Sequence, residues 1–291
     1  MTQSTQNNPE KMNCMEIWGG NQQTNKQFNT PGLNIILDSQ PFQNSNTGGG
    51  DIYYFTSCAS GRITRILLAD VSGHGEDAAD LAISLRDLMR ENVNKINQSH
   101  FVKQVNREFA STANSQGFAT ALIVTFFRPT RTLSISNAGH PNPFFYSQAR
   151  QKWATLDSHQ FSCNSSTAEQ LYNLPLGVLQ NTGYPSTSTK TRQGDLLFLY
   201  TDAFNECIDK NGQPIGVTGL LDTLNRTKTG TPSDVLPNLK EELKRLSPSN
   251  LKQDDATAIV GEFTDTKINW KDNLAAPFRL LRKTRDRTQI T

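Results

Sequence analysis

Four short acidic motifs constrain this chain of 291 residues more than any other feature of its sequence. Each motif ends an apolar run, leads into one, or follows a row of glycines. Their carboxylates belong to Asp51, Asp70, Asp202 and the neighbours Asp254 and Asp255. One such motif alone reads as an ordinary turn. A carboxylate at the tip of a buried strand is nevertheless costly unless its charge is compensated, and four motifs in a chain with only 19% charged residues indicate a shared purpose.

Divalent cations are the compensation that these residue types favour. Carboxylates that gather without cations repel one another and hold protons, whereas Mg²⁺ and Mn²⁺ bind oxygen ligands by preference. Glycines 48–50, 73 and 75 stand beside the acids and allow backbone, ions and a phosphate to approach closely. The sequence has no GxxxxGK[ST] motif, so a Walker-type nucleotide loop is not expected.

The periodicity of apolar residues predicts strands and helices in blocks. Expected strands are 34–37, 52–58, 62–69, 119–127, 133–136, 143–146, 196–200 and 256–263, with a hairpin at 59–61. Expected helices are 78–94, 101–110, 217–224 and 235–246. Blocks of strands between pairs of helices are typical of an α+β domain with sheets in the middle and helices outside.

Other classes of protein are disfavoured by what the sequence lacks. No run approaches the roughly 18–20 apolar residues of a membrane span, and the first residues contain no apolar block of a secretory signal. The four cysteines are widely spaced, form no CxxC pair and begin no Cys-x5-Arg phosphate loop. They suit reduced thiols, so a cytoplasmic protein is expected and a cysteine phosphatase is not.

The two ends of the chain differ in composition from the middle. Residues 1–30 are rich in Asn, Gln and Thr and predict a flexible lead-in, with Trp18 as an apolar anchor on the core. Residues 264–291 form a basic tail with a net charge of +4, against −2 for the rest. The expected division is therefore a segment 1–30, a catalytic domain 31–263 and a tail 264–291. A solvated tail is the simpler interpretation, and a salt-sensitive nucleic-acid contact is the alternative.

Taken together, the motifs resemble the metal-dependent protein phosphatase 2C superfamily, in the bacterial branch typified by SpoIIE and RsbU. The resemblance runs from about residue 34 to 263. Its motifs, in order, are GGD (49–51), DVSGHG (70–75), NAGHPNP (137–143), LPLGV (174–178), LLFLYTD (196–202) and DDAT (254–257). GGD alone is also found in diguanylate cyclases, but the residues that follow it here do not continue that pattern.

The resemblance implies a fold, a pair of metals and roles for particular residues. The fold is a four-layer αββα sandwich of two antiparallel sheets flanked by helices, with two Mn²⁺ or Mg²⁺ ions at one edge. Asp70 would bridge the ions and the Val71 carbonyl would bind one of them. The remaining implied ligands are Asp202 and Asp254 at one ion, Asp51 at the other, and Asp255 as a substitute or support for Asp254.

The implied reaction is hydrolysis of phosphoserine or phosphothreonine in a partner protein by a water that the two metals activate. No covalent intermediate is needed, which agrees with the missing cysteine motif. His74 is the nearest candidate to protonate the leaving oxygen, with a turn histidine as the alternative. His140 is expected to be structural, holding the strand turn beneath the site. One departure is Ala203, where the family usually has glycine.

The resemblance also suggests a partner, an anti-sigma-factor antagonist with a STAS domain in a bacterial partner-switching pathway. Nucleic acid is an unlikely partner, and a homodimer remains open. The alternative function is a non-catalytic binding module that keeps the phosphatase fold. Loss of activity on changing Asp70 would exclude that alternative.

Overall fold

The structure is a computed structural model that describes residues 10–12, 16–42, 48–58, 61–73, 76–92, 95, 97–112, 117–156, 173–227, 231–266 and 285–289. Its strands are β1 (Glu10–Lys11), β2 (Glu16–Gly20), β3 (Thr24–Thr30), β4 (Leu33–Gln40), β5 (Asp51–Cys58), β6 (Ile63–Val71), β7 (Ala119–Phe127), β8 (Thr132–Ala138), β9 (Phe144–Ser147), β10 (Lys152–Thr155), β11 (Thr187–Lys190), β12 (Leu196–Tyr200), β13 (Ala256–Phe263) and β14 (Arg285–Gln289). Its helices are α1 (Glu76–Glu91), α2 (Gln98–Thr112), α3 (Gly216–Arg226) and α4 (Pro232–Leu246), with 3₁₀ turns η3 (Arg128–Thr130) and η5 (Asp202–Phe204).

The strands form two seven-stranded sheets. The first has the order β1-β3-β4-β13-β12-β9-β10, and the second has the order β11-β8-β7-β6-β5-β2-β14. All pairings are antiparallel except β1 with β3 and β14 with β2, which are parallel. The expected hairpin is present, since all of β5 pairs with β6 from Ile63 to Asp70.

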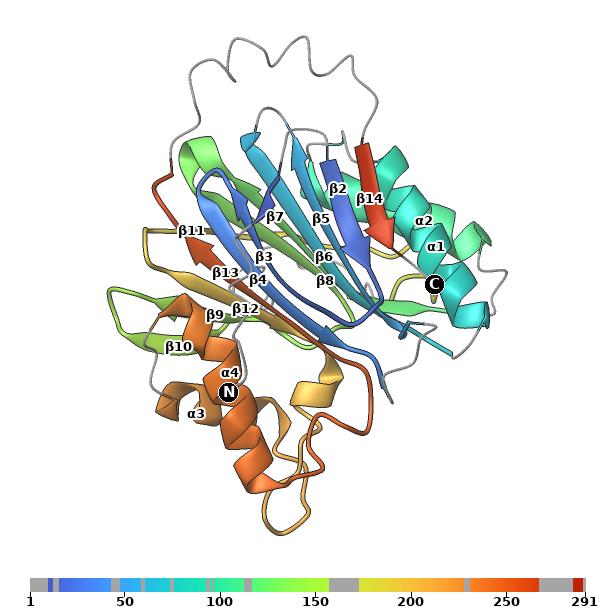
Figure 1. The fold of residues 1–291 in the computed structure, drawn as a ribbon. Helices are drawn as coiled ribbons and strands as arrows, with labels where there is room; N and C mark the ends of the chain where they lie inside the picture. The colour runs from blue at the N-terminus through green and yellow to red at the C-terminus, as the bar shows by residue number, and fades with distance from the viewer. Residues whose placement is uncertain are drawn as a thin grey trace, which may run out of the picture.

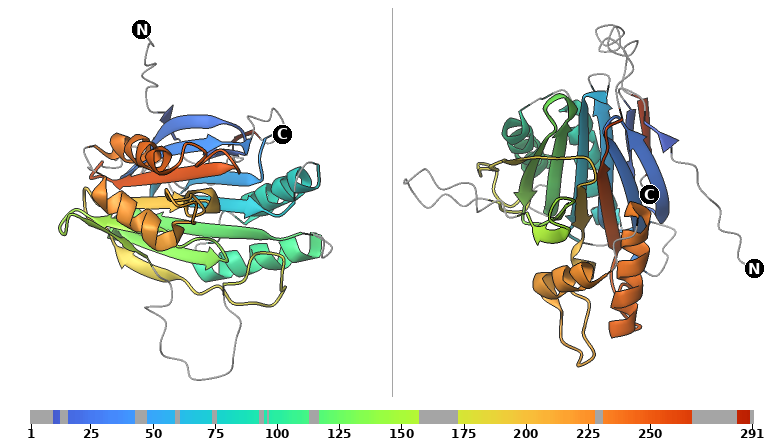
Figure 2. Two further views of the ribbon diagram at one scale, coloured as in Figure 1. Left: turned by 90° about the horizontal axis from the view of Figure 1, so that it is seen from below. Right: turned by 90° about the vertical axis from the view of Figure 1, so that its left-hand side faces the viewer.

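The sheets and helices stack in four layers (Figures 1 and 2). One apolar cluster fills the space between the two sheets. A second lies between the second sheet and α1 and α2, and a third lies between the first sheet and α3 and α4. The predicted αββα sandwich is therefore confirmed. None of the described helices has both the length and the apolar character that crossing a membrane requires.

Strands in the centre of each sheet are apolar on both faces because both faces are covered. In β12, Leu197 and Leu199 point into the layer between the sheets, whereas Phe198 and Tyr200 pack toward α3 and α4. Burying a Leu or Phe side chain is worth about 1.5–3 kcal/mol. Continuous apolar runs thus fix the central strands, and the acids of interest lie at the ends of these runs.

The N-terminal segment differs from the expected flexible lead-in. Within the expected segment 1–30, β2 pairs with β5 in the second sheet, and β3 pairs with β4 in the first. Trp18 is the anchor that the sequence predicts, since it is buried between the sheets with its ring 5.1 Å from that of Phe28. Residues 16–30 are therefore part of the core. Their polar composition concealed this role, because backbone pairing holds these strands as much as apolar side chains do.

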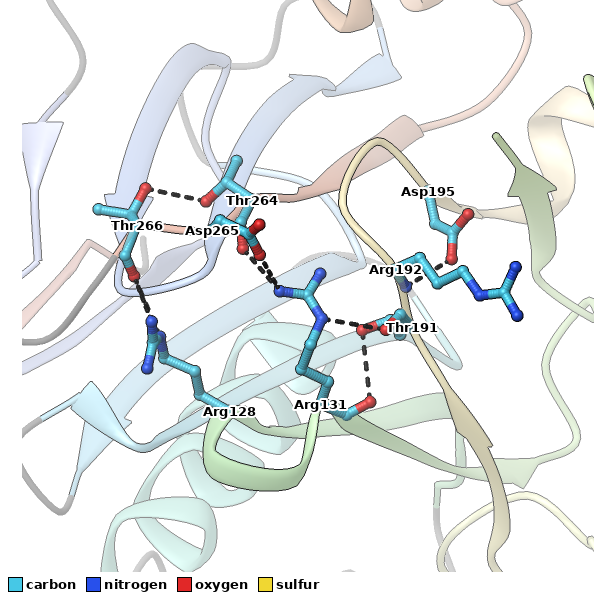
Figure 3. Close-up of polar contacts among 8 residues, drawn as sticks. All are labelled: Arg128, Arg131, Thr191, Arg192, Asp195, Thr264, Asp265 and Thr266. Carbon is cyan, nitrogen blue, oxygen red and sulfur yellow. Dashed lines mark hydrogen bonds and ion pairs between the residues drawn. The ribbon is translucent and has the colours of Figure 1, made fainter. Parts of the chain in front are cut away.

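The chain that leaves β13 is held to the opposite sheet by two arginines (Figure 3). Arg131 donates to Asp265 Oδ1 at 2.6 Å and to the Thr191 carbonyl at 3.0 Å. Arg128 Nη2 donates to the Thr266 carbonyl at 2.8 Å. Further on, residues 285–289 form β14 beside β2. At these positions the backbone of the basic C-terminal segment forms a strand of the second sheet.

Trp18→Ala tests whether the N-terminal strands are part of the core. Removing this buried ring is expected to lower the free energy of unfolding by about 3–5 kcal/mol, the usual range for Trp or Phe truncation in a core. Urea unfolding followed by circular dichroism measures it. Gln23→Ala, at an exposed turn position between β2 and β3, is the control and should change stability by no more than about 0.5 kcal/mol. If both variants are as stable as the wild type, the result would contradict a core role for Trp18 and support the expectation of a flexible N-terminal segment.

Candidate functional site: an acidic edge of the sandwich

Strand pairing brings the predicted acids to one edge of the sandwich. Asp51 begins β5 and is the register partner of Asp70 near the end of β6. In the other sheet, Asp202 follows β12 and Asp254 and Asp255 precede β13. Because β12 and β13 are antiparallel neighbours, the end of one and the start of the other meet at the same edge.

Two hydrogen bonds join the acids of the two sheets across this edge. The Thr201 hydroxyl, beside Asp202 in the first sheet, donates to Asp51 Oδ2 at 2.8 Å. The backbone N–H of Gly50 donates to Asp255 Oδ2 at 2.6 Å. The four motifs that are separate in sequence thus form a single site.

Asp70 lies at the electrostatic centre of the site. Its pKa is raised from 3.8 to about 6, first by burial and then by the negative charges of four neighbouring carboxylates. These neighbours are Asp202, Asp254, Asp255 and Glu206. Burial and Asp254 likewise raise the pKa of Asp202. Such mutual repulsion is what a bound cation would relieve.

Asp51 is the most deeply buried of the acids. Burial raises its pKa well above the usual value and the charge of Asp70 raises it further, while hydrogen bonds from Thr201 and Thr257 act in the opposite direction. Both threonines belong to the sequence motifs, YTD and DDAT. Their role as donors to Asp51 was not predicted, although their position beside the acids was visible in the sequence.

The neighbours Asp254 and Asp255 have different surroundings. Both carboxylate oxygens of Asp255 accept backbone N–H groups, Oδ1 from Phe42 and Oδ2 from Gly50, each at 2.6 Å. Within the described part of the chain, Asp254 Oδ1 accepts the N–H of Asp255 at 2.8 Å and no second hydrogen bond to this carboxylate is found. Asp255 therefore fastens the loop before β5, and Asp254 keeps more of its carboxylate available.

The glycines before Asp51 leave room in front of the acidic oxygens. A Cβ at Gly49 would lie 2.5 Å from Asp255 Oδ2. At Gly50 it would lie 3.1 Å from the Val71 carbonyl oxygen and 3.5 Å from Asp70 Oδ1. The sequence thus keeps this space free of side chains.

The donor set fits Mg²⁺ or Mn²⁺ in its chemistry, since carboxylate and carbonyl oxygens are the ligands such ions prefer. Among the described residues, no group of three or more His, Cys, Asp or Glu side chains is arranged so that it could hold a metal ion.

Two further expectations from the sequence concern His74 and Ala203, and one acidic residue of the site, Glu206, was not predicted. His74 lies outside the described residues, so its role as a proton donor stays a prediction. Ala203 lies within η5, whose helical backbone accepts a Cβ, and its backbone φ is not positive. Glu206 was missed by sequence analysis. It follows Asp202 by four residues, and burial and then Asp202 raise its pKa.

His140 connects the two acid-bearing sheets behind the site. Its Nε2 lies 3.0 Å from the Tyr200 carbonyl, which only accepts, so Nε2 carries the proton. Its Nδ1 lies 2.9 Å from Thr120 Oγ1 and accepts from that hydroxyl. Thr120 is the register partner of Asp70, and Tyr200 lies two residues before Asp202. The Asn137 carboxamide holds the turn by accepting from the His140 N–H and donating to its carbonyl, each at 2.8 Å.

Asp70→Asn is expected to stabilise the protein when metal is removed with EDTA. The folded-state pKa of Asp70, about 6, exceeds the unfolded value because of burial and then of neighbouring negative charges, so the ionised carboxylate costs stability as pH rises from about 4 to 6 and throughout the range above. The neutral amide removes that cost, roughly 2–3 kcal/mol at pH 7.5, and the gain should vanish near pH 4. Urea unfolding at both pH values measures it. Asp222→Asn, on the exposed face of α3, is the control, and a loss of stability at pH 7.5 in Asp70→Asn would contradict the repulsion.

The contribution of His140 to stability should depend on pH in the opposite direction to that of Asp70. Burial lowers its pKa to about 4, with the Tyr200 hydrogen bond acting against the shift. The stability that its neutral form supplies is complete above about pH 6.5 and is lost as pH falls toward 4. His140→Gln should therefore unfold more easily at pH 7.5 and lose less stability than the wild type between pH 6.5 and 4.5. Urea titrations measure this, with exposed His100→Gln as control. Parallel pH profiles for wild type and His140→Gln would refute it.

Comparison with known sequences agrees with this geometry. The sequence model of the family described as Stage II sporulation protein E (SpoIIE) matches residues 60–264. The phosphoserine phosphatase RsbU of Bacillus subtilis is 24% identical over 213 residues, which cover 72% of this chain and 58% of RsbU. The chain spans a little over half the length of the curated relatives it matches.

Solved structures share the fold. The RsbU and RsbW domains of a Mycobacterium tuberculosis protein superpose with a TM-score of 0.64 at 21% identity, covering 82% of this chain and 63% of that one. The catalytic domain of the serine/threonine phosphatase PstP, in complex with two manganese ions, superposes with a TM-score of 0.52 at 13% identity, covering 80% of this chain and 99% of PstP.

Proposed function

The chain belongs to the SpoIIE family, and from that premise we propose that it is a metal-dependent phosphatase of phosphoserine or phosphothreonine in a partner protein. The observation that carries the proposal is the convergence of carboxylates from both sheets beside Asp70, held by the register of Asp51 with Asp70 and by the hydrogen bonds from Thr201 to Asp51 and from Gly50 to Asp255. Burial and then these neighbouring charges raise the pKa of Asp70 to about 6. The neighbouring charges that act on Asp70 in this way are those of Asp202, Asp254, Asp255 and Glu206. Bound cations would compensate this negative charge.

The surroundings of each acid support an assignment of the ligands to the two cations. The space beside Gly50 is bordered by Asp70 and by the Val71 carbonyl oxygen. Asp70 would contact both ions, and the Val71 carbonyl oxygen would contact one of them. Asp202 and Asp254 would complete the shell of one ion and Asp51 would serve the other. Asp255 would act mainly by holding the loop of Gly50 in place.

Two divalent cations held there would lower the pKa of a water and neutralise charge on the phosphoryl oxygens. The protein supplies the positions. Thr201 orients the Asp51 carboxylate through its 2.8 Å hydrogen bond, and His140 ties the strand of Tyr200 to Thr120 beside Asp70. His74, four residues after Asp70, is our candidate to protonate the leaving serine or threonine oxygen.

For the partner, we propose a phosphorylated STAS-domain protein of a bacterial partner-switching pathway. Support comes from the relatives: one is named a phosphoserine phosphatase, and one solved structure joins RsbU and RsbW domains in a single protein. A cytoplasmic location would follow from such a partner. Mass spectrometry of a serine-phosphorylated STAS protein before and after incubation tests the partner, and an unchanged mass would remove it.

The catalytic proposal predicts turnover of p-nitrophenyl phosphate that requires Mn²⁺ or Mg²⁺ and stops in EDTA. Asp70→Asn and Asp202→Asn should each lose at least about 100-fold in kcat/KM, because cation binding supplies several kcal/mol of charge stabilisation. Asp222→Asn should match the wild type.

If the wild type does not hydrolyse p-nitrophenyl phosphate with either metal, a phosphoserine peptide is the second substrate to be assayed. No hydrolysis of either substrate, together with no metal binding by calorimetry, would contradict the proposal and favour the non-catalytic binding module.

A further inference from the structure

Few large apolar side chains are exposed on the described part of the molecule, and three of them lie together. The exposed set is Phe42, Phe118, Phe127, Val178, Leu179 and Val217. Phe118, Val178 and Leu179 form what we call the apolar rim, with 44%, 52% and 44% of their surfaces exposed. Scattered exposed apolar residues need no explanation, whereas a group of them marks a binding surface.

Backbone pairing joins the two segments of the apolar rim. Ala119, next to Phe118, donates its N–H to the Leu176 carbonyl at 2.9 Å and accepts the Leu176 N–H at 2.7 Å. Gly177 is so close to the chain before Phe118 that a Cβ on it would lie 2.9 Å from the Gly117 carbonyl oxygen. Phe118 and Val178 therefore belong to adjacent stretches of backbone.

The apolar rim is also fastened to the strand that carries Asp70. The Phe118 N–H donates to Ser72 Oγ at 2.8 Å, and the Ser72 N–H donates to the Phe118 carbonyl at 2.9 Å. Ser72 lies two residues after Asp70 and one after Val71. The apolar rim is thus directly adjacent to the candidate metal site, through the hydrogen bonds between Phe118 and Ser72.

A buried side chain of α2 holds the loop of the apolar rim. Asn106 is fully buried, and its carboxamide accepts the Gly177 N–H at 2.9 Å. The same side chain donates to the carbonyls of Leu179 at 2.9 Å and Gln180 at 3.2 Å. The backbone of the loop is fixed, although the side chains of Val178 and Leu179 are exposed. Such preorganisation lowers the entropic cost of binding a partner.

We propose that the apolar rim docks the phosphoprotein substrate by receiving apolar side chains that flank its phosphorylated serine or threonine. The inference rests on the proposed function, because the phosphorylated residue at Asp70 places its neighbours beside Ser72 and Phe118. The carboxylates of the site offer nothing attractive to an anionic peptide apart from the cations they hold. Apolar contact beside them adds the affinity and the choice of substrate that the metal site alone does not give.

The experiment compares two phosphoserine peptides of equal length and charge, one with two leucines on each side of the phosphoserine and one with two serines there. With Mn²⁺, the wild type should hydrolyse the leucine peptide with a kcat/KM about tenfold higher. In the double variant Val178→Ser, Leu179→Ser this ratio should fall to near one. The double variant Phe127→Ser, Val217→Ser removes exposed apolar side chains at other places in the fold and should keep the ratio. Thermal unfolding of each variant verifies folding.

A binding measurement separates this inference from the proposed function. Fluorescence anisotropy of the labelled peptides with Mn²⁺-loaded protein should show weaker binding of the leucine peptide by the Val178→Ser, Leu179→Ser variant, whether or not turnover occurs. Selective binding without hydrolysis of either peptide or of p-nitrophenyl phosphate would overturn the phosphatase and keep the docking surface. Equal handling of both peptides by the wild type, or unchanged selectivity in the rim variant, would overturn the docking surface alone.

Discussion

Repulsion between closely placed carboxylates, one of them the buried Asp51, is the constraint on which this structure depends. Asp51 and Asp70 face each other across β5 and β6, and Asp202, Asp254 and Asp255 approach from the other sheet. Without cations such an arrangement costs free energy, so the rest of the fold must hold it in place. The apolar layers on both faces of the central strands supply that rigidity, and the acids lie at the strand ends.

The connections across the site matter as much as the acids. Thr201 and His140 each join one sheet to the other within two residues of an acid, through a hydroxyl bound to Asp51 and an imidazole between Thr120 and Tyr200. Neither side chain carries charge in these roles. They fix the spacing of the two strands, which an apolar core alone sets less sharply because its contacts have no direction.

The sequence allowed the central strands, all four helices and the convergence of the acids to be predicted. Strands such as 119–127 and 256–263 are found at the expected residues because burial on both faces demands continuous apolar runs. The donor roles of Thr201 and Thr257, the separate tasks of Asp254 and Asp255, and the part played by Glu206 required coordinates. They depend on which polar group meets which across the two sheets, and local sequence does not contain that information.

The strands that escaped prediction include all four sheet edges, β1, β10, β11 and β14. Each is short, and each carries charged residues among its two to five positions. An open edge is a template on which a second molecule can add a strand, and lysine or arginine along it opposes that addition. The composition that makes these strands hard to recognise by hydrophobic periodicity is thus of the kind that opposes the addition of a further strand at a sheet edge.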